Sequence, residues 1–115
     1  VLRICNAERK KAGLPELKWY EDAYYFANIR AKELQKEWSH TRPNGTKCFT
    51  ALAEADISYM AAGENLAGRI KTPEKVVDAW MNSPGHRKNI MNPKYSQIGV
   101  GYVSSGNYWS QFFVG

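Results

Sequence analysis

Apolar residues recur at helical spacing most clearly between positions 20 and 38. Side chains three and four residues apart share one face of a helix, so this spacing predicts a long helix that ends near Trp38. Phe26 and Ile29 add a second apolar side, and the helix should therefore be buried on more than one face. The main stripe consists of Tyr20, Ala23, Tyr24, Ala27, Ala31, Leu34 and Trp38.

Capping and helix-breaking residues predict further helices on either side of this one. A helix over 2–12 should end at Gly13, because glycine commonly follows the last helical residue. Thr72 is a suitable cap for another helix, with a proline in its first turn, and the Ser-Pro-Gly sequence at 83–85 should end it. An apolar edge also predicts a short helix over 49–55.

The last part of the chain shows the alternation typical of β-strands. Residues 97–103 and 108–114 are predicted strands, joined by a hairpin loop at 104–107. The segment 61–68 is edged by glycines and breaks the helical pattern, so it is predicted to be another strand. Helices, then mixed elements, then strands fit an α+β domain or a sandwiched α/β/α domain with an antiparallel sheet.

Composition places the chain among ordinary globular domains. Its 115 residues suffice for one domain with a buried core, and its apolar share is 43%. The formal net charge of +5 raises the question of nucleic-acid binding. However, the one basic run is 9–11, other basic residues alternate with acidic ones, and no RNA-binding or zinc-finger signature is present. We therefore expect a solvated basic surface and no nucleic-acid partner.

The sequence contains no apolar stretch near the roughly 18 residues that a membrane span requires. It also contains no signal peptide, but the first residue is Val1 and a helical pattern begins at once. We therefore expect a single domain over 1–115 that has been excised from a longer precursor. It should have no transmembrane segment and should be a monomer.

The chain has two cysteines, Cys5 and Cys48. They are too far apart for a CxxC redox motif and too few for a zinc knuckle. They could form a disulfide, which requires an oxidising compartment and would stabilise the fold by roughly 4 kcal/mol on the chain-entropy model. They could equally be two separate thiols buried as small apolar groups. Composition and spacing leave both possibilities open.

Candidate chemistry is concentrated in the only two histidines and one carboxylate. His40 precedes a Pro-Asn-Gly turn and His86 follows Ser-Pro-Gly, so both are expected in loops, where functional groups are common. Neutral imidazole is a common ligand of zinc and copper. Glu64 lies in the strand-like segment beside a glycine, and Asn65 could satisfy backbone groups nearby. Two surface histidines and a solvated carboxylate are the alternative interpretation.

Six segments in order match a known family. Together they resemble the CAP superfamily, which includes cysteine-rich secretory proteins, insect venom antigens and plant pathogenesis-related proteins. The similarity is greatest to the bacterial SCP-like extracellular branch, and it covers nearly the whole chain. The Gly-Glu-Asn and Gly-His-Arg sequences are specific as an ordered pair. The matching segments are NAERKKAGL at 6–14, SHTRPNG at 39–45, AGENLA at 62–67, AWMNSPGHRKNI at 79–90, IGVGY at 98–102 and YWSQFF at 108–113.

This resemblance implies a three-layer α/β/α sandwich with a small antiparallel sheet, and a cleft with two histidines and two acidic residues. His40, Glu64 and His86 match three of these positions. Asp78, just ahead of a tryptophan, matches the fourth position, where the family usually has Glu. A helical wheel instead places Asp78 away from the apolar stripe and predicts that it faces solvent. The same fold could bring the segments of the two cysteines together, so a disulfide between them is a prediction.

The resemblance also implies a secreted, extracellular protein. We expect the cleft to bind a divalent cation such as Zn²⁺, with His40 and His86 as ligands, Asn65 in support, and no obligatory cofactor. One alternative is a metal-assisted hydrolase or peptidase in which Glu64 is the candidate catalytic residue. A second alternative is a lipid or sterol binding module, because some members of the family bind such ligands. The partner is expected to be an extracellular protein, peptide or lipid.

Overall fold

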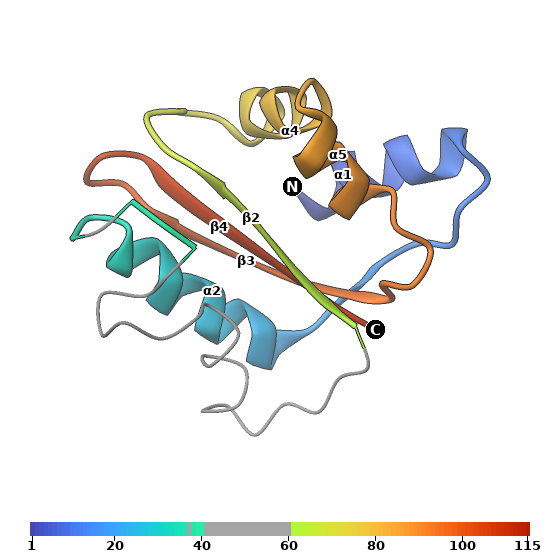
Figure 1. The fold of residues 1–115 in the computed structure, drawn as a ribbon, viewed down its shortest axis with the longest axis horizontal. Coiled ribbons are helices and arrows are strands. Elements are labelled where there is room, and N and C mark those ends of the chain that lie inside the picture. The colour runs from blue at the N-terminus through green and yellow to red at the C-terminus, as the bar shows by residue number, and fades with distance from the viewer. Residues whose placement is uncertain (37, 41–60) are drawn as a thin grey trace.

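The structure is a computed structural model that describes residues 1–36, 38–40 and 61–115. The predicted short helix over 49–55 therefore lies outside the described residues. The described chain contains four helices and four strands, and Figure 1 shows their arrangement. The helices are α1 (Leu2–Lys11), α2 (Glu21–Glu33), α4 (Pro73–Met81) and α5 (Pro84–Ile90), and the strands are β1 (Lys18–Trp19), β2 (Ala62–Ala67), β3 (Gln97–Val103) and β4 (Tyr108–Val114).

The four-stranded sheet has the order β1-β3-β4-β2, so β2 is an edge strand among the described residues. Both β3 and β2 pair antiparallel with β4, which confirms the predicted hairpin and the predicted strand over 61–68. The short strand β1 pairs in parallel with β3. The predicted antiparallel sheet is thus formed by β2, β4 and β3, and the parallel strand β1, which was not predicted, makes the whole sheet mixed. Two exposed residues are too few to show strand alternation in a sequence.

Helices cover both faces of this sheet. α2 lies on one face, and α1, α4 and α5 lie on the other, as Figure 1 shows. This arrangement confirms the three-layer sandwich. α2 approaches β3 closely because small residues face each other: Ala23 and Ala27 are fully buried, and a β-carbon on Gly99 or Gly101 would overlap their backbone. The aromatic residues Phe112 and Phe113 of β4 fill the core on either side of the sheet.

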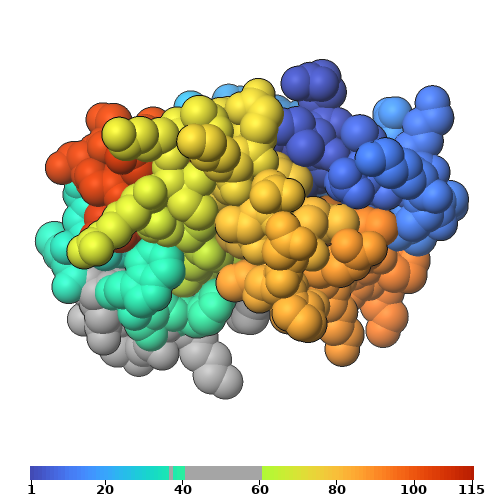
Figure 2. All heavy atoms as spheres, turned by 90° about the horizontal axis from the view of Figure 1, so that it is seen from above, coloured from blue at the N-terminus to red at the C-terminus, as the bar shows by residue number. Residues whose placement is uncertain are grey.

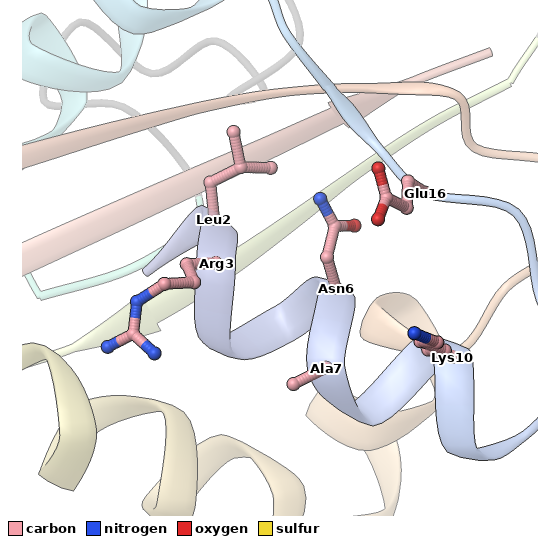
Figure 3. Close-up of a pocket in the computed structure, with 6 residues that line it drawn as sticks. All are labelled: Leu2, Arg3, Asn6, Ala7, Lys10 and Glu16. Carbon is pink, nitrogen blue, oxygen red and sulfur yellow. The ribbon is translucent and has the colours of Figure 1, made fainter.

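α1 is attached to the rest of the molecule by polar contacts as well as by apolar packing. Asn6 binds the chain just before β1, donating to the carbonyl of Leu17 at 3.0 Å and accepting from its N–H at 2.7 Å. Figure 3 shows Asn6 on the same side of the helix as Leu2, directed toward the segment that carries Glu16. These paired hydrogen bonds set the position of α1 relative to β1.

Arg9 departs from the expected pattern, because it lies among residues predicted to face water and is fully buried. Its guanidinium donates to the carbonyls of Pro15 at 2.8 Å, Ile90 at 3.0 Å, Asn92 at 2.9 Å and Tyr95 at 3.3 Å. The Ile90 and Asn92 carbonyls lie at the C-terminal end of α5, where carbonyls lack helical partners. Arg9 thus joins α1 to α5, and its five donors make the burial possible.

Two helix boundaries differ from the sequence prediction. α2 ends at Glu33 rather than near Trp38, and the side chain of Trp38 is 57% exposed. Arg30 donates to the carbonyl of Ser39 at 2.6 Å, which holds the chain after α2 back against the helix. The Ser-Pro-Gly sequence ends α4 but also begins α5, because proline fits the first turn of a helix. His86 is therefore in a helix, and its predicted placement in a loop was wrong.

Candidate functional site

Glu64 lies in β2 and is almost completely buried, with 5% of its surface exposed. Its carboxylate forms a two-point ion pair with Arg30 of α2, which is fully buried. Arg30 Nε lies 2.8 Å from Glu64 Oε2, and Nη2 lies 3.2 Å from Oε1. Burial alone would lower the pKa of Arg30, but hydrogen bonds and the negative charges of Glu64 and Glu33 outweigh it and raise that pKa. Arg30 therefore keeps its charge in this buried position.

His40 reaches the same carboxylate from the solvent side. Its Nδ1 lies 2.9 Å from Glu64 Oε1, and its side chain is 61% exposed. A buried carboxylate accepts hydrogen bonds, so this geometry favours the tautomer of neutral His40 that carries its proton on Nδ1. The Nε2 atom of His40 then keeps a lone pair for a ligand.

His86 belongs to the first turn of α5 and is partly buried. Burial lowers the pKa of His86 below its ordinary value, and the nearby charge of His40 lowers it further. The imidazole of His86 is therefore neutral at pH 7. Figure 2 shows the teal segment before residue 41 beside the yellow-green β2 region, with orange α5 on the other side of β2. The edge of the sheet at β2 thus carries groups from three parts of the chain.

A network of buried amides fixes α5 against this edge. Asn65 donates from Nδ2 to the His86 carbonyl at 3.2 Å and to Gln111 Oε1 at 3.1 Å. Asn89 donates to Asn65 Oδ1 at 2.9 Å and to the Glu64 carbonyl at 3.3 Å. Asn65 and Gln111 are both fully buried, so the hydrogen bond between them forms away from solvent and is costly to lose. The network sets the position of the helix turn that carries His86.

Comparison with known proteins identifies the family. Residues 2–115 match the model of the family described as "CAP: Cysteine-rich secretory protein family". The chain belongs to the CAP family. Among curated proteins, it is 45% identical over 117 residues to the uncharacterized protein YkwD of Bacillus subtilis (strain 168), covering 100% of this chain and 46% of YkwD. It is 29% identical over 116 residues to the uncharacterized membrane protein YlbC of the same strain, covering 99% of this chain and 33% of YlbC. This CAP domain therefore spans less than half the length of these relatives.

Solved structures with the same fold include two bacterial surface or extracellular proteins. An extracellular protein containing a SCP domain from Bacillus anthracis str. Ames has a TM-score of 0.92 at 27% identity, covering 98% of this chain and 38% of that one. An outer surface protein from Borrelia burgdorferi has a TM-score of 0.88 at 25% identity, covering 98% and 87%. A cysteine-rich secretory protein from Staphylococcus aureus shares the fold, with a TM-score of 0.85 at 23% identity, covering 98% and 36%. Within the described residues of this chain, no helix is long and apolar enough to span a membrane.

Asp78 lies apart from the contact between His40 and Glu64 in this CAP domain. Its side chain is exposed on α4 and lines a separate hollow between α1 and α4. Within the described part of the chain, no three His, Cys, Asp or Glu side chains lie close enough to hold a metal ion together. The exposure of Asp78 agrees with its position on the helical wheel, away from the apolar stripe. A fourth group from this position would not contribute to a site at β2.

Cys5 is a free thiol in this structure, so the predicted disulfide with Cys48 is not found. Cys48 itself lies outside the described residues. The Cys5 side chain is fully buried, and Gln111 Nε2 donates to its sulfur at 3.4 Å. Burial raises the pKa of Cys5, and a buried protonated thiol is inert. Cys5 therefore packs as a small apolar group at one end of the amide network.

Sequence reasoning missed Arg30, Asn89 and Gln111, which hold the site residues in place. Asn89 could have been identified from its spacing, because it lies three positions after His86 and residues three apart on a helix share a face. Gln111 is a polar residue in a strand that is otherwise largely apolar, and Arg30 interrupts the buried side of α2. A polar residue at a buried position of a pattern requires a partner, and this rule would have marked both.

Proposed function

We propose that this CAP domain acts outside the cell as a divalent-cation binding module in which His40 and His86 are the protein ligands. Zn²⁺ is the cation that best fits two imidazoles. The observation that carries the proposal is the 2.9 Å contact between His40 Nδ1 and the buried carboxylate of Glu64. When the Nδ1–H of a histidine donates to a carboxylate, the Nε2 atom of the same ring is left free to bind a metal. Carboxylate–histidine–zinc arrangements commonly work in this way.

The state of each group supports this role. Arg30 pairs with the buried carboxylate of Glu64 and holds it in place, so Glu64 can orient His40 and make it a better donor to a metal. The lowered pKa of His86 favours its neutral form, and only a neutral imidazole can bind a metal. Two histidines leave coordination positions for water or for a ligand, so the site would be open and weaker than one with three protein ligands.

The contacts of Glu64 favour a binding role over hydrolysis. Oε2 accepts from Arg30, and Oε1 faces both Arg30 and His40. A general base must reach a water molecule with a free oxygen and have a pKa close to the working pH. Both oxygens of Glu64 already accept hydrogen bonds, so Glu64 is better suited to positioning His40 than to activating water.

An extracellular location is supported by the relatives rather than by the chain itself. Two of the structural relatives are named as an extracellular protein and an outer surface protein. Cations and acidic polymers are available to a basic domain in that setting. Fractionation of the native host, with an antibody against this domain, should recover the protein from the medium or the cell surface. Recovery only from the cytosol would contradict this part of the proposal.

Titration calorimetry of Zn²⁺ into the whole chain tests cation binding. The wild-type chain should bind one ion, and the double variant His40→Ala/His86→Ala should give only the heat of dilution. Glu64→Gln should weaken binding by about 10-fold to 100-fold, as expected for loss of a group that orients a ligand. Asp78→Asn is the matched control and should bind like the wild type, because Asp78 lies in a different hollow. Equal heats from the wild type and the double variant would remove the proposal.

A further inference from the structure

A second hollow lies beyond the far end of β2 and has no part in the proposed cation site. Among the described residues, it is lined by Trp38, Gly68, Arg69 and Tyr108, and its volume is about 300 Å³. Gly68 is four residues after Glu64, a separation of roughly 13 Å along an extended chain. The hollow is therefore adjacent to the cation site but distinct from it.

Two aromatic side chains form the wall of this hollow. The rings of Trp38 and Tyr108 have centroids 5.9 Å apart and planes tilted by 38°. Trp38 is 57% exposed, so one of the largest apolar side chains of the molecule faces solvent here. A β-carbon on Gly68 would lie 3.1 Å from both rings, which is tighter than ordinary contact. The glycine thus allows the two rings to pack over the backbone after β2.

Arg69 provides the charge of this hollow. Its φ is +62°, in the left-handed region that residues other than glycine and asparagine seldom adopt. Its N–H donates to the carbonyl of Gly106 at 3.0 Å, which ties this residue to the β3–β4 hairpin. Within the described part of the chain, its exposed guanidinium has no hydrogen bond or ion pair of its own. The structure thus holds a free guanidinium beside two aromatic rings.

We propose that this hollow binds a sugar residue that carries a carboxylate, as in an acidic polysaccharide. The apolar face of the sugar ring would stack on Trp38 and Tyr108, and the carboxylate would pair with Arg69. The net charge of +5 would also attract an acidic polymer.

A peptide fits this hollow less well than a sugar. Extended peptides are recognised mainly through backbone hydrogen bonds, with side-chain pockets adding specificity. Here the N–H of Arg69 is already bound to Gly106. The lining therefore offers rings and a guanidinium rather than backbone partners.

Calorimetry with the whole chain in metal-free buffer tests the proposal independently of the cation site. The probes are trigalacturonate, its fully methyl-esterified form, and hexaglutamate as an acidic peptide. Trigalacturonate should bind at least about tenfold more tightly than the ester, because the ester lacks the charge that Arg69 requires. It should also bind more tightly than hexaglutamate. The proposal would be overturned if the ester, or hexaglutamate, bound as tightly as trigalacturonate.

Substitutions in and away from the hollow test whether trigalacturonate binds there. Trp38→Ala and Arg69→Asn should each weaken trigalacturonate binding by about tenfold or more, and asparagine tolerates the backbone conformation of Arg69. Trp19→Ala and Arg3→Gln are matched controls at other exposed positions and should bind like the wild type. Circular dichroism should show the same fold in all four variants. Equal losses in Arg69→Asn and Arg3→Gln would show binding through overall charge and would also overturn the proposal. Failure of Zn²⁺ binding would leave these results unaffected.

Discussion

Arg9 and Arg30 are both fully buried, yet their surroundings move their pKa values in opposite directions. Arg9 is bound by neutral carbonyls, so burial lowers its pKa. Arg30 is bound by the carboxylates of Glu64 and Glu33, which outweigh burial and raise its pKa. The first arrangement joins two helices. The second leaves a charged carboxylate below the surface with an oxygen directed at His40, and a candidate site is built on it.

Arg30→Met should have the largest effect on stability. It leaves the buried carboxylate of Glu64 without a counter-charge, and loss of one partner of a buried pair costs about 3–5 kcal/mol. Urea denaturation at pH 7 should show this decrease in the free energy of unfolding. The decrease should become smaller as the pH falls, because protonation removes the unpaired charge of Glu64.

The double variant Arg30→Met/Glu64→Leu is the control for this effect. Replacing both partners of a buried pair by apolar residues is often close to neutral, so most of the lost stability should return. If the double variant were as unstable as Arg30→Met, packing rather than the unpaired charge would explain the loss.

Arg9→Met should have the second-largest effect on stability. The free energy of unfolding should decrease by about 3 kcal/mol, because several buried carbonyls lose their donor. The comparison between the two arginines predicts a difference in function as well. At a temperature where the variant is folded, Zn²⁺ binding should be unchanged, since Arg9 contacts the end of α5 and not the histidines. Loss of Zn²⁺ binding in folded Arg9→Met would show that the two regions are not separable.

Asn65→Ala should destabilise the domain by about 2 kcal/mol, because buried groups of Asn89 and Gln111 lose a partner. It should also weaken Zn²⁺ binding, since Asn65 fixes the turn that carries His86. Asn82→Ala is a suitable control, because Asn82 is exposed and its side chain bonds only within α4. Chemical denaturation and calorimetry measure the two effects separately.

His86→Gln should have the smallest effect, and it should depend on pH. The pKa of His86 is lowered in the folded protein, so the unfolded chain binds its proton more readily below its ordinary pKa of 6.5. The folded state of the wild type therefore loses stability as the pH falls from 6.5 toward the lower folded pKa. Thermal unfolding between about pH 7.5 and 5 should show a flatter dependence in the variant, and an unchanged slope would contradict this assignment.

Elements with regular patterns were predictable from the sequence. The Thr72 cap of α4 and the alternation of β3 and β4 each reflect one local rule, and the structure follows them. The predicted stripe of α2 is buried at its alanines, but Tyr24 and Trp38 are exposed. α5 was missed because Pro84 and Gly85 were interpreted as the end of a helix, although proline is also suited to a helix start. The two residues of β1 depend on pairing with β3, which no local pattern encodes.

The candidate site was only partly predictable. The motifs indicated His40 and Glu64, and the structure places them in contact. Periodicity can mark Arg30 and Gln111 as polar residues at buried positions, but it cannot show which groups they bind. Arg30 and Gln111 are buried because each meets a complementary group from a distant part of the chain. Such pairs depend on tertiary structure.

The most direct test of the cation site is an NMR measurement of the imidazole nitrogens during Zn²⁺ titration. The chain has only two histidines, so each ring can be assigned without ambiguity. Before metal is added, neutral His40 should carry its proton on Nδ1, opposite Glu64. With Zn²⁺, Nε2 of His40 and one nitrogen of His86 should shift together and saturate at one ion per chain. A proton on Nε2 of neutral His40, or a shift of one ring alone, would contradict the account.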